Sequence, residues 1–175
     1  MAVLYSEKRS EIKTGDLLAW KITKINSFFD LVLFLYQKIF KAKYTHVAIA
    51  FKEGNRLFIL EATPPEVRLF PVSMTDDFYL FSLNLNIDSS HIDIILRKLG
   101  IKYGLCDLIR SILKLSDNKK EEYCSELASK FYNEIGFIND KEAGFTPDTI
   151  VEAIQREHDI EPILVKIDRN NLSGV

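Results

Sequence analysis

Hydrophobic residues in the first half of the chain follow the two-residue alternation, or the short apolar runs, that are typical of β-strands. Strands are predicted over residues 17–21, 44–51, 57–62, 67–71 and 78–84, with a last strand at 163–167. Gly54 and Asn55 stand between two of these segments, which predicts a β-hairpin. Pro64 and Pro65 follow the second strand of that hairpin and end it, because proline cannot donate to the ladder.

Helical periodicity predominates in the second half of the chain and in one earlier segment. Helices are predicted over residues 27–41, 89–99, 107–115, 122–135 and from 146 onward. Ser89 or Ser90 is expected to cap the second helix, Gly136 to end the fourth, and Thr146 to cap the last. Because strands come mostly early and helices mostly late, the pattern predicts an α+β fold with an antiparallel sheet rather than a doubly wound βαβ fold.

The size and charge of the chain narrow the class of protein. At 175 residues and 20.2 kDa, the length predicts a single domain over residues 1–175, with its core at about 15–167. Lys and Arg number 23 and Asp and Glu 25, which gives a formal net charge of −2. This near-neutral balance offers no global electrostatic reason to bind nucleic acid, and we expect no nucleic-acid partner.

Cysteine and histidine usage bears on the compartment and on cofactors. Cys106 and Cys124 are too few for a disulfide scaffold. The N-terminal sequence shows no apolar stretch of the kind found in a secretory signal, so we expect a cytoplasmic protein with free thiols. No His, Cys, Asp and Glu residues have metal-ligand spacing, and we expect neither a metal nor another cofactor. His91 and His158 lie in polar stretches and are expected in solvent.

Cys124 stands where its thiol can be activated. It opens the helical face formed with Leu127, Ala128 and Phe131, so it is expected at a helix N-terminus on the inward side. The unpaired backbone N–H groups and the positive end of the helix dipole stabilise a thiolate there. An ordinary thiol, with a pKa of ~8.5, is only slightly ionised near neutral pH. The alternative is that Cys124 is simply a small buried hydrophobic residue.

His46 and Glu61 lie at the same end of the predicted hairpin. His46 shares one face of its strand with Ala48 and Ala50, and these small residues leave room beside the imidazole. Pairing across a turn centred near Gly54 puts His46 opposite one of residues 61–63. A carboxylate beside an imidazole fixes its tautomer and orientation. The alternatives are a structural histidine and a strand-end carboxylate in solvent.

Three short motifs resemble those of a known family. They are Thr45-His46-Val47-Ala48-Ile49, Leu60-Glu61-Ala62 and Tyr123-Cys124-Ser125-Glu126-Leu127. In this order they resemble the circularly permuted papain-like cysteine hydrolases of the NlpC-type superfamily. The resemblance is greatest to the YiiX-like branch, and lecithin retinol acyltransferase is a more distant relative. Further similar segments are Gly15-Asp16-Leu17-Leu18, Lys102-Tyr103-Gly104 and Thr146-Pro147-Asp148.

The resemblance implies a papain-like α+β fold, with an antiparallel sheet packed against the helix that bears the nucleophile. It implies a cysteine hydrolase, an amidase or peptidase, with Cys124 as nucleophile, His46 as base and Glu61 as the group that orients the imidazole. Tyr103 is implied near the oxyanion, and Tyr123 and Glu126 as further binding positions of the motif. For Tyr103 the alternative is core packing, and for Glu126 a favourable charge at a helix N-terminus.

The substrate class stays open between a peptide, a peptidoglycan fragment and an acyl lipid. The segment 28–43 departs from the family pattern as a long apolar helix before His46. It is too short and too interrupted, by Asp30, Gln37 and Lys38, to span a membrane. A core helix and a membrane-surface helix both fit it, since lysines flank its apolar residues. A lipid-directed acyl hydrolase or acyltransferase is therefore the first alternative, and a non-catalytic binding module on the same fold the second.

Overall fold

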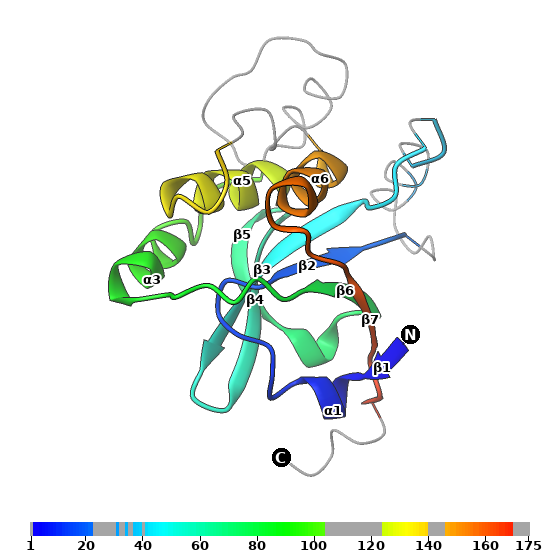
Figure 1. Ribbon diagram of the computed structural model, residues 1–175, viewed down its shortest axis with the longest axis horizontal. Coiled ribbons are helices and arrows are strands. Elements are labelled where there is room, and N and C mark those ends of the chain that lie inside the picture. The colour runs from blue at the N-terminus through cyan, green and yellow to red at the C-terminus, as the bar shows by residue number, and fades with distance from the viewer. Residues whose placement is uncertain are drawn as a thin grey trace.

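The computed structural model describes residues 2–22, 31, 34, 37–39, 41–103, 124–139 and 146–169 (Figure 1). The helix predicted over 107–115, Cys106 and most of the helix predicted over 27–41 lie outside the described residues. The described residues between 31 and 39 are helical, as the sequence predicts.

The described strands form one seven-stranded sheet in the order β1-β7-β6-β2-β3-β4-β5. Their bounds are β1 Ala2–Leu4, β2 Leu17–Trp20, β3 His46–Glu53, β4 Arg56–Thr63, β5 Glu66–Pro71, β6 Phe78–Phe81 and β7 Ile163–Lys166. Neighbouring strands are antiparallel except β1 and β7, which pair in parallel. The mixed α+β class is confirmed, but the prediction of a wholly antiparallel sheet is wrong at this edge. The reason is β1, whose three residues carry no readable periodicity and which docks beside the last strand.

The helices are α1 Tyr5–Lys8, the 3₁₀ turn η1 Val72–Met74, α3 Ser89–Leu96, α5 Cys124–Glu134 and α6 Pro147–His158. Helices α5 and α6 lie side by side against one face of the sheet (Figure 1). Thr146 caps α6 as predicted, with its hydroxyl accepting from the Thr149 N–H at 3.1 Å. Gly136 follows the end of α5 with a φ of 68°, where a glycine avoids the strain of a side chain.

The predicted cap of α3 is wrong. The N-cap is Asp88, whose carboxylate accepts from the Ser90 and His91 N–H groups, rather than Ser89 or Ser90. The His91 ring accepts in return from the Asp88 N–H at 3.2 Å. This reciprocal capping gives His91 a structural contact where the sequence predicts only solvent. His158 is exposed but stacks on Phe137, with ring centroids 3.9 Å apart.

Two apolar clusters cover the two faces of the sheet. Val47, Ile49 and Leu60 belong to the cluster that includes the inward residues of α5 and α6. Ala48 and Ile59 belong to the other, which the N-terminal segment completes. Alternate residues of β3 and β4 therefore point into different cores, as the two-residue period of a strand requires. The sheet is thus fixed from both sides, which holds the ends of its central strands in place.

A buried carboxylate joins the segment before β2 to the rest of the fold. Asp16 is 2% exposed, and its two oxygens accept from the Lys13 N–H at 2.9 Å and the Leu83 N–H at 2.8 Å. Burial raises the pKa of Asp16 above its usual value, while the bonds from these N–H groups act in the opposite direction. The Tyr132 hydroxyl of α5 donates to the Gly15 carbonyl at 2.8 Å. This junction therefore ties α5, and with it Cys124, to the sheet.

We predict that Asp16→Ala destabilises the fold, because it leaves the Lys13 and Leu83 N–H groups without their acceptor. The loss should be about 1–3 kcal/mol of unfolding free energy for each donor left buried and unpaired. Urea unfolding followed by circular dichroism measures it. Asp93→Ala, which truncates an exposed carboxylate on α3, is the control and should change stability by no more than about 0.5 kcal/mol. Equal stability of the two variants would contradict the role given to Asp16.

Candidate active site

The hairpin of β3 and β4 places His46 and Glu61 on one face of the sheet. Its register pairs Ile49 with Leu60, within the range that the sequence predicts. His46 precedes Ile49 by three residues and Glu61 follows Leu60 by one, so alternation directs both side chains to the same side. His46 is the first residue of β3, which puts it at the end of the strand rather than in its middle.

The His46 imidazole and the Glu61 carboxylate are hydrogen-bonded, with Nε2 and Oε2 2.9 Å apart. Glu61 is 7% exposed, so its contact with His46 is shielded from solvent. Trp20, directly opposite His46 in the β2–β3 ladder, packs on the imidazole with ring centroids 5.4 Å apart. These two contacts fix the plane of the ring. In the neutral ring, a carboxylate at Nε2 favours the tautomer that carries its proton there.

Cys124 lies near the same imidazole. It is the first described residue of α5, is 3% exposed and forms no disulfide. Its sulfur lies close enough to the His46 side chain to raise the pKa of the imidazole. Since Nε2 is engaged by Glu61, the ring nitrogen left for the sulfur is Nδ1. The structure therefore brings Cys124 near a His46 ring that is hydrogen-bonded to Glu61.

The electrostatics of this group favour a charged imidazole. Burial alone would lower the pKa of His46, but the nearby Cys124 sulfur and the contact with Glu61 outweigh it and raise the pKa above the usual value. Burial alone would raise the pKa of Glu61, but the contacts with His46 and Arg68 lower it overall. The carboxylate is thus held ionised beside a ring that holds a proton strongly.

Arg68 is a member of this group that the sequence analysis missed. The β4–β5 register sets it directly opposite Glu61, and its Nε and Nη2 lie 3.0 Å and 2.9 Å from Glu61 Oε1. One carboxylate oxygen therefore faces Arg68 and the other faces His46. A signal for it was present in the sequence, because pairing across a turn at Pro64 and Pro65 brings residues 61 and 68 together.

Tyr103 lies close enough to Cys124 for the two to interact electrostatically. Its N–H donates to the Pro65 carbonyl at 2.9 Å, which anchors it beside the β4–β5 turn. Burial raises the pKa of its hydroxyl, and a negative charge on Cys124 raises it further. The hydroxyl therefore keeps its proton and can act as a hydrogen-bond donor near the sulfur.

The two remaining motif positions are Tyr123 and Glu126. Tyr123 lies outside the described residues. Glu126 forms an ion pair with Lys130 one helical turn further along α5, with Oε1 and Nζ 2.8 Å apart. That contact fits a role on the flank of the helix better than a contact with the thiol.

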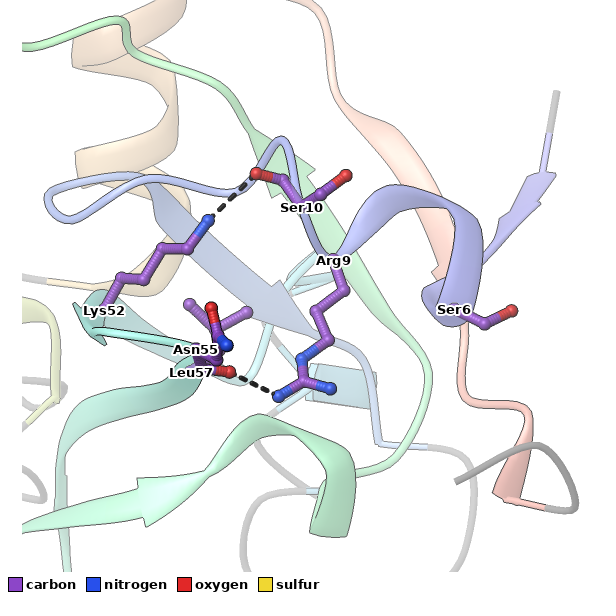
Figure 2. A pocket seen from close by; sticks show the side chains of 6 residues that line it. All are labelled: Ser6, Arg9, Ser10, Lys52, Asn55 and Leu57. Carbon is purple, nitrogen blue, oxygen red and sulfur yellow. Dashed lines mark hydrogen bonds between the residues drawn. The ribbon is translucent and has the colours of Figure 1, made fainter. Parts of the chain in front are cut away.

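A cavity of about 280 Å³ lies elsewhere, between the N-terminal segment and the turn of the β3–β4 hairpin (Figure 2). Arg9 donates to the Asn55 carbonyl at 2.6 Å and Lys52 to the Ser10 carbonyl at 2.9 Å. His46 and Glu61 stand at the opposite end of the same hairpin. The two cations thus fasten the N-terminal segment to the hairpin, away from Cys124.

Within the described ranges, no group of three or more His, Cys, Asp or Glu side chains is arranged to hold a metal ion. Nor is any helix in those ranges long and apolar enough to cross a membrane.

No family model matches the chain, and no curated protein matches it. Among solved structures, the fold is similar to that of a protein described as the metalloprotein YiiX from Escherichia coli O157:H7, with a TM-score of 0.54 and 14% sequence identity. The similarity covers 91% of this chain and 92% of that chain. At this identity the likeness concerns the fold alone. It supports the YiiX-like part of the sequence resemblance, and the chain has a mixed α+β fold similar to that of YiiX.

Proposed function

We propose that this protein is a cysteine hydrolase, an amidase or peptidase, built on a circularly permuted papain-like fold. The observation that carries the proposal is that the Cys124 sulfur lies near the His46 imidazole, whose Nε2 is hydrogen-bonded to the Glu61 carboxylate at 2.9 Å. Nucleophile, base and orienting acid are the three roles that thiol hydrolysis needs, and each residue has the chemistry for one of them. The order of histidine, acid and cysteine along the chain supports the permuted form.

In the proposed reaction His46 Nδ1 accepts the thiol proton, which leaves a thiolate beside an imidazolium. The thiolate attacks the acyl carbonyl, and the carbonyl electron pair moves onto its oxygen. We assign the backbone N–H of Cys124 and the Tyr103 hydroxyl as the donors to that oxyanion. Donors of this kind contribute roughly 2.7–4 kcal/mol each to transition-state stabilisation in known enzymes.

The tetrahedral intermediate then collapses, and the bond to the leaving group breaks. The imidazolium gives its proton to the departing amine, while the acyl group stays on sulfur as a thioester. His46 next takes a proton from water, whose oxygen attacks the thioester carbonyl. The C–S bond then breaks, the acyl group leaves as a carboxylic acid, and the imidazolium returns its proton to the sulfur. An alcohol or amine in place of water would make the same intermediate a route to acyl transfer.

A lipid-directed acyl hydrolase or acyltransferase is the second candidate, and one observation favours it. Ile39 is 70% exposed and Leu31 is 39% exposed, although both are large apolar side chains. Lys41, which follows them closely, is exposed as well. Apolar residues beside lysine are typical of segments that bind the surface of a membrane.

Alkylation of Cys124 tests the activated thiol. We expect Cys124→Ala to abolish labelling by iodoacetamide at this position, and His46→Ala to slow it by about 10²–10⁴-fold, the usual contribution of a general base. Peptide mass spectrometry separates Cys124 from Cys106. His91→Ala removes a histidine that only caps α3 and is the matched control. Equal labelling rates in the wild type and His46→Ala, with a pH dependence that follows the ordinary thiol pKa, would favour a non-catalytic binding module.

The pH dependence of the same labelling tests the ion pair. Since the contacts of His46 raise its pKa, the imidazole should stay protonated through neutral pH, and in the proposed reaction that proton comes from the thiol. Labelling of the wild type should therefore be nearly level between about pH 6 and 8. In His46→Ala the rate should fall about tenfold for each pH unit below the ordinary thiol pKa of ~8.5. A wild-type profile that follows the ordinary thiol curve would argue against a preformed pair.

Substrate panels separate the peptide and lipid forms of the proposal. An amidase should cleave a short peptide or a peptidoglycan stem peptide, and Cys124→Ala should not. A lipid-directed enzyme should bind anionic phosphatidylglycerol vesicles and release fatty acid. Ile39→Asp should then weaken vesicle binding by about tenfold or more, whereas Met74→Asp, at another exposed apolar residue, should leave it unchanged. Vesicle binding that is equal in both variants would remove the lipid candidate.

A further inference from the structure

Arg68 makes an unusual contact for a half-exposed arginine, because its partner is buried. The side chain of Arg68 is 45% exposed, whereas that of Glu61 is 9% exposed. Both Nε and Nη2 of the guanidinium lie within 3.0 Å of the same oxygen, Oε1 of Glu61. A surface ion pair contributes little, but a buried carboxylate needs its charge compensated. The contact therefore stabilises the charge of Glu61 rather than adding a loose surface pair.

The guanidinium is itself held in place. Its central carbon lies 4.7 Å from the centroid of the Phe70 ring, two residues further along β5. A guanidinium over an aromatic face is attracted by the ring and loses freedom to rotate. Cross-strand pairing sets Arg68 directly opposite Glu61, so backbone register and ring contact both aim it at Oε1.

We propose that Arg68 is a positioning residue, which holds the Glu61 carboxylate ionised and turned so that Oε2 meets His46 Nε2, and thereby supports the reactivity of Cys124. This inference rests on the proposed function of the Cys124–His46–Glu61 group. Arg68 lies on the far side of Glu61 from His46 and acts through the carboxylate.

The charged groups that face Glu61 come from two neighbouring strands: His46 from β3 and Arg68 from β5. Cys124 of α5 acts on it through His46. Burial favours the neutral carboxyl, and these two contacts oppose burial. Without Arg68, Glu61 should therefore take up a proton at a higher pH than in the wild type. A protonated Glu61 no longer supports the imidazolium, so the acid limb of Cys124 labelling should move to higher pH.

A double-mutant cycle tests the inference, with the rate of Cys124 alkylation as the readout. Arg68→Met keeps the length of the side chain and removes its hydrogen-bond donors. It should slow labelling at pH 7 by about tenfold, the usual loss when a residue that orients a site residue is removed. Glu61→Gln should also slow it. The double variant should be no slower than Glu61→Gln alone, because Arg68 acts only through the carboxylate. Arg56→Met, at an exposed arginine on β4, is the matched control and should label like the wild type.

Arg68→Ala with added guanidinium chloride gives a second measurement, because the exposed position can admit a free guanidinium ion. Millimolar guanidinium, far below denaturing concentration, should restore the labelling rate, and equal concentrations of sodium chloride should not. Arg68→Lys keeps the positive charge but has fewer hydrogen-bond donors. The acid limb of its labelling pH profile should therefore stay near that of the wild type, while its labelling rate falls. Thermal unfolding of each variant shows whether it is folded at the temperature of labelling.

The results distinguish a failure of this inference from a failure of the proposed function. If His46→Ala labels as fast as the wild type, the proposed function fails, and the role of Arg68 fails with it. If labelling depends on His46 and Glu61 but Arg68→Met keeps the wild-type rate and pH profile, only the inference about Arg68 is overturned. A double variant that is slower than Glu61→Gln by the full factor of Arg68→Met would also overturn it.

Discussion

The hydrogen bond between His46 Nε2 and Glu61 Oε2 is the contact on which the candidate site depends. An imidazole has two nitrogens, and a carboxylate at one of them decides what the other can do. With Nε2 committed to Glu61, Nδ1 is available to the Cys124 thiol. The register of the β3–β4 hairpin puts the two residues in reach, so the chemistry depends on a backbone pairing that apolar residues maintain.

The second constraint is that charge is buried at the end of a sheet with apolar cores on both faces. Glu61 and Asp16 are both buried carboxylates, but their surroundings differ. The Asp16 carboxylate accepts hydrogen bonds from backbone N–H groups, and burial raises its pKa. Glu61 faces two side-chain cations, and its pKa is lowered. The first therefore fastens loops to the sheet, whereas the second has the charge that an imidazolium needs beside it.

Local pattern predicted much of the fold. The hairpin turn at Gly54, the Thr146 cap and the register near His46 all depend on residues close together in sequence, and the structure confirms them. The predicted α3 cap was one or two residues too late, since Asp88 competes with the two serines that follow it and only the backbone geometry decides between them. The parallel pairing of β1 with β7 joins segments near the two ends of the chain, and no sequence pattern in either segment predicts it.

The candidate site could be predicted only in part, for the same reason. His46 and Glu61 are linked by one turn, so their proximity follows from the pairing rule. The contact between Cys124 and His46 joins a helix to a distant strand, and the sequence indicated it only through a family resemblance. Arg68 could have been found by extending the pairing rule across the next turn. Cross-strand pairing therefore indicates site residues on the strand beyond a candidate hairpin as well as on the hairpin itself.

The four groups form a line in which charge alternates: Arg68 positive, Glu61 negative, His46 positive when protonated, and Cys124 negative when ionised. The line as a whole is neutral in that state. Arg68 and His46 each lie within hydrogen-bonding reach of Glu61, and the Cys124 sulfur lies near His46. Moving one proton from His46 to sulfur leaves neutral Cys124 and His46 beside the Arg68–Glu61 pair, which is neutral too. A thiol and its base can thus exchange a proton in a buried place without either state leaving an uncompensated charge. Without Arg68 the line carries a net negative charge in both states. Protonation of Glu61 would then remove the uncompensated charge at the lowest cost in free energy.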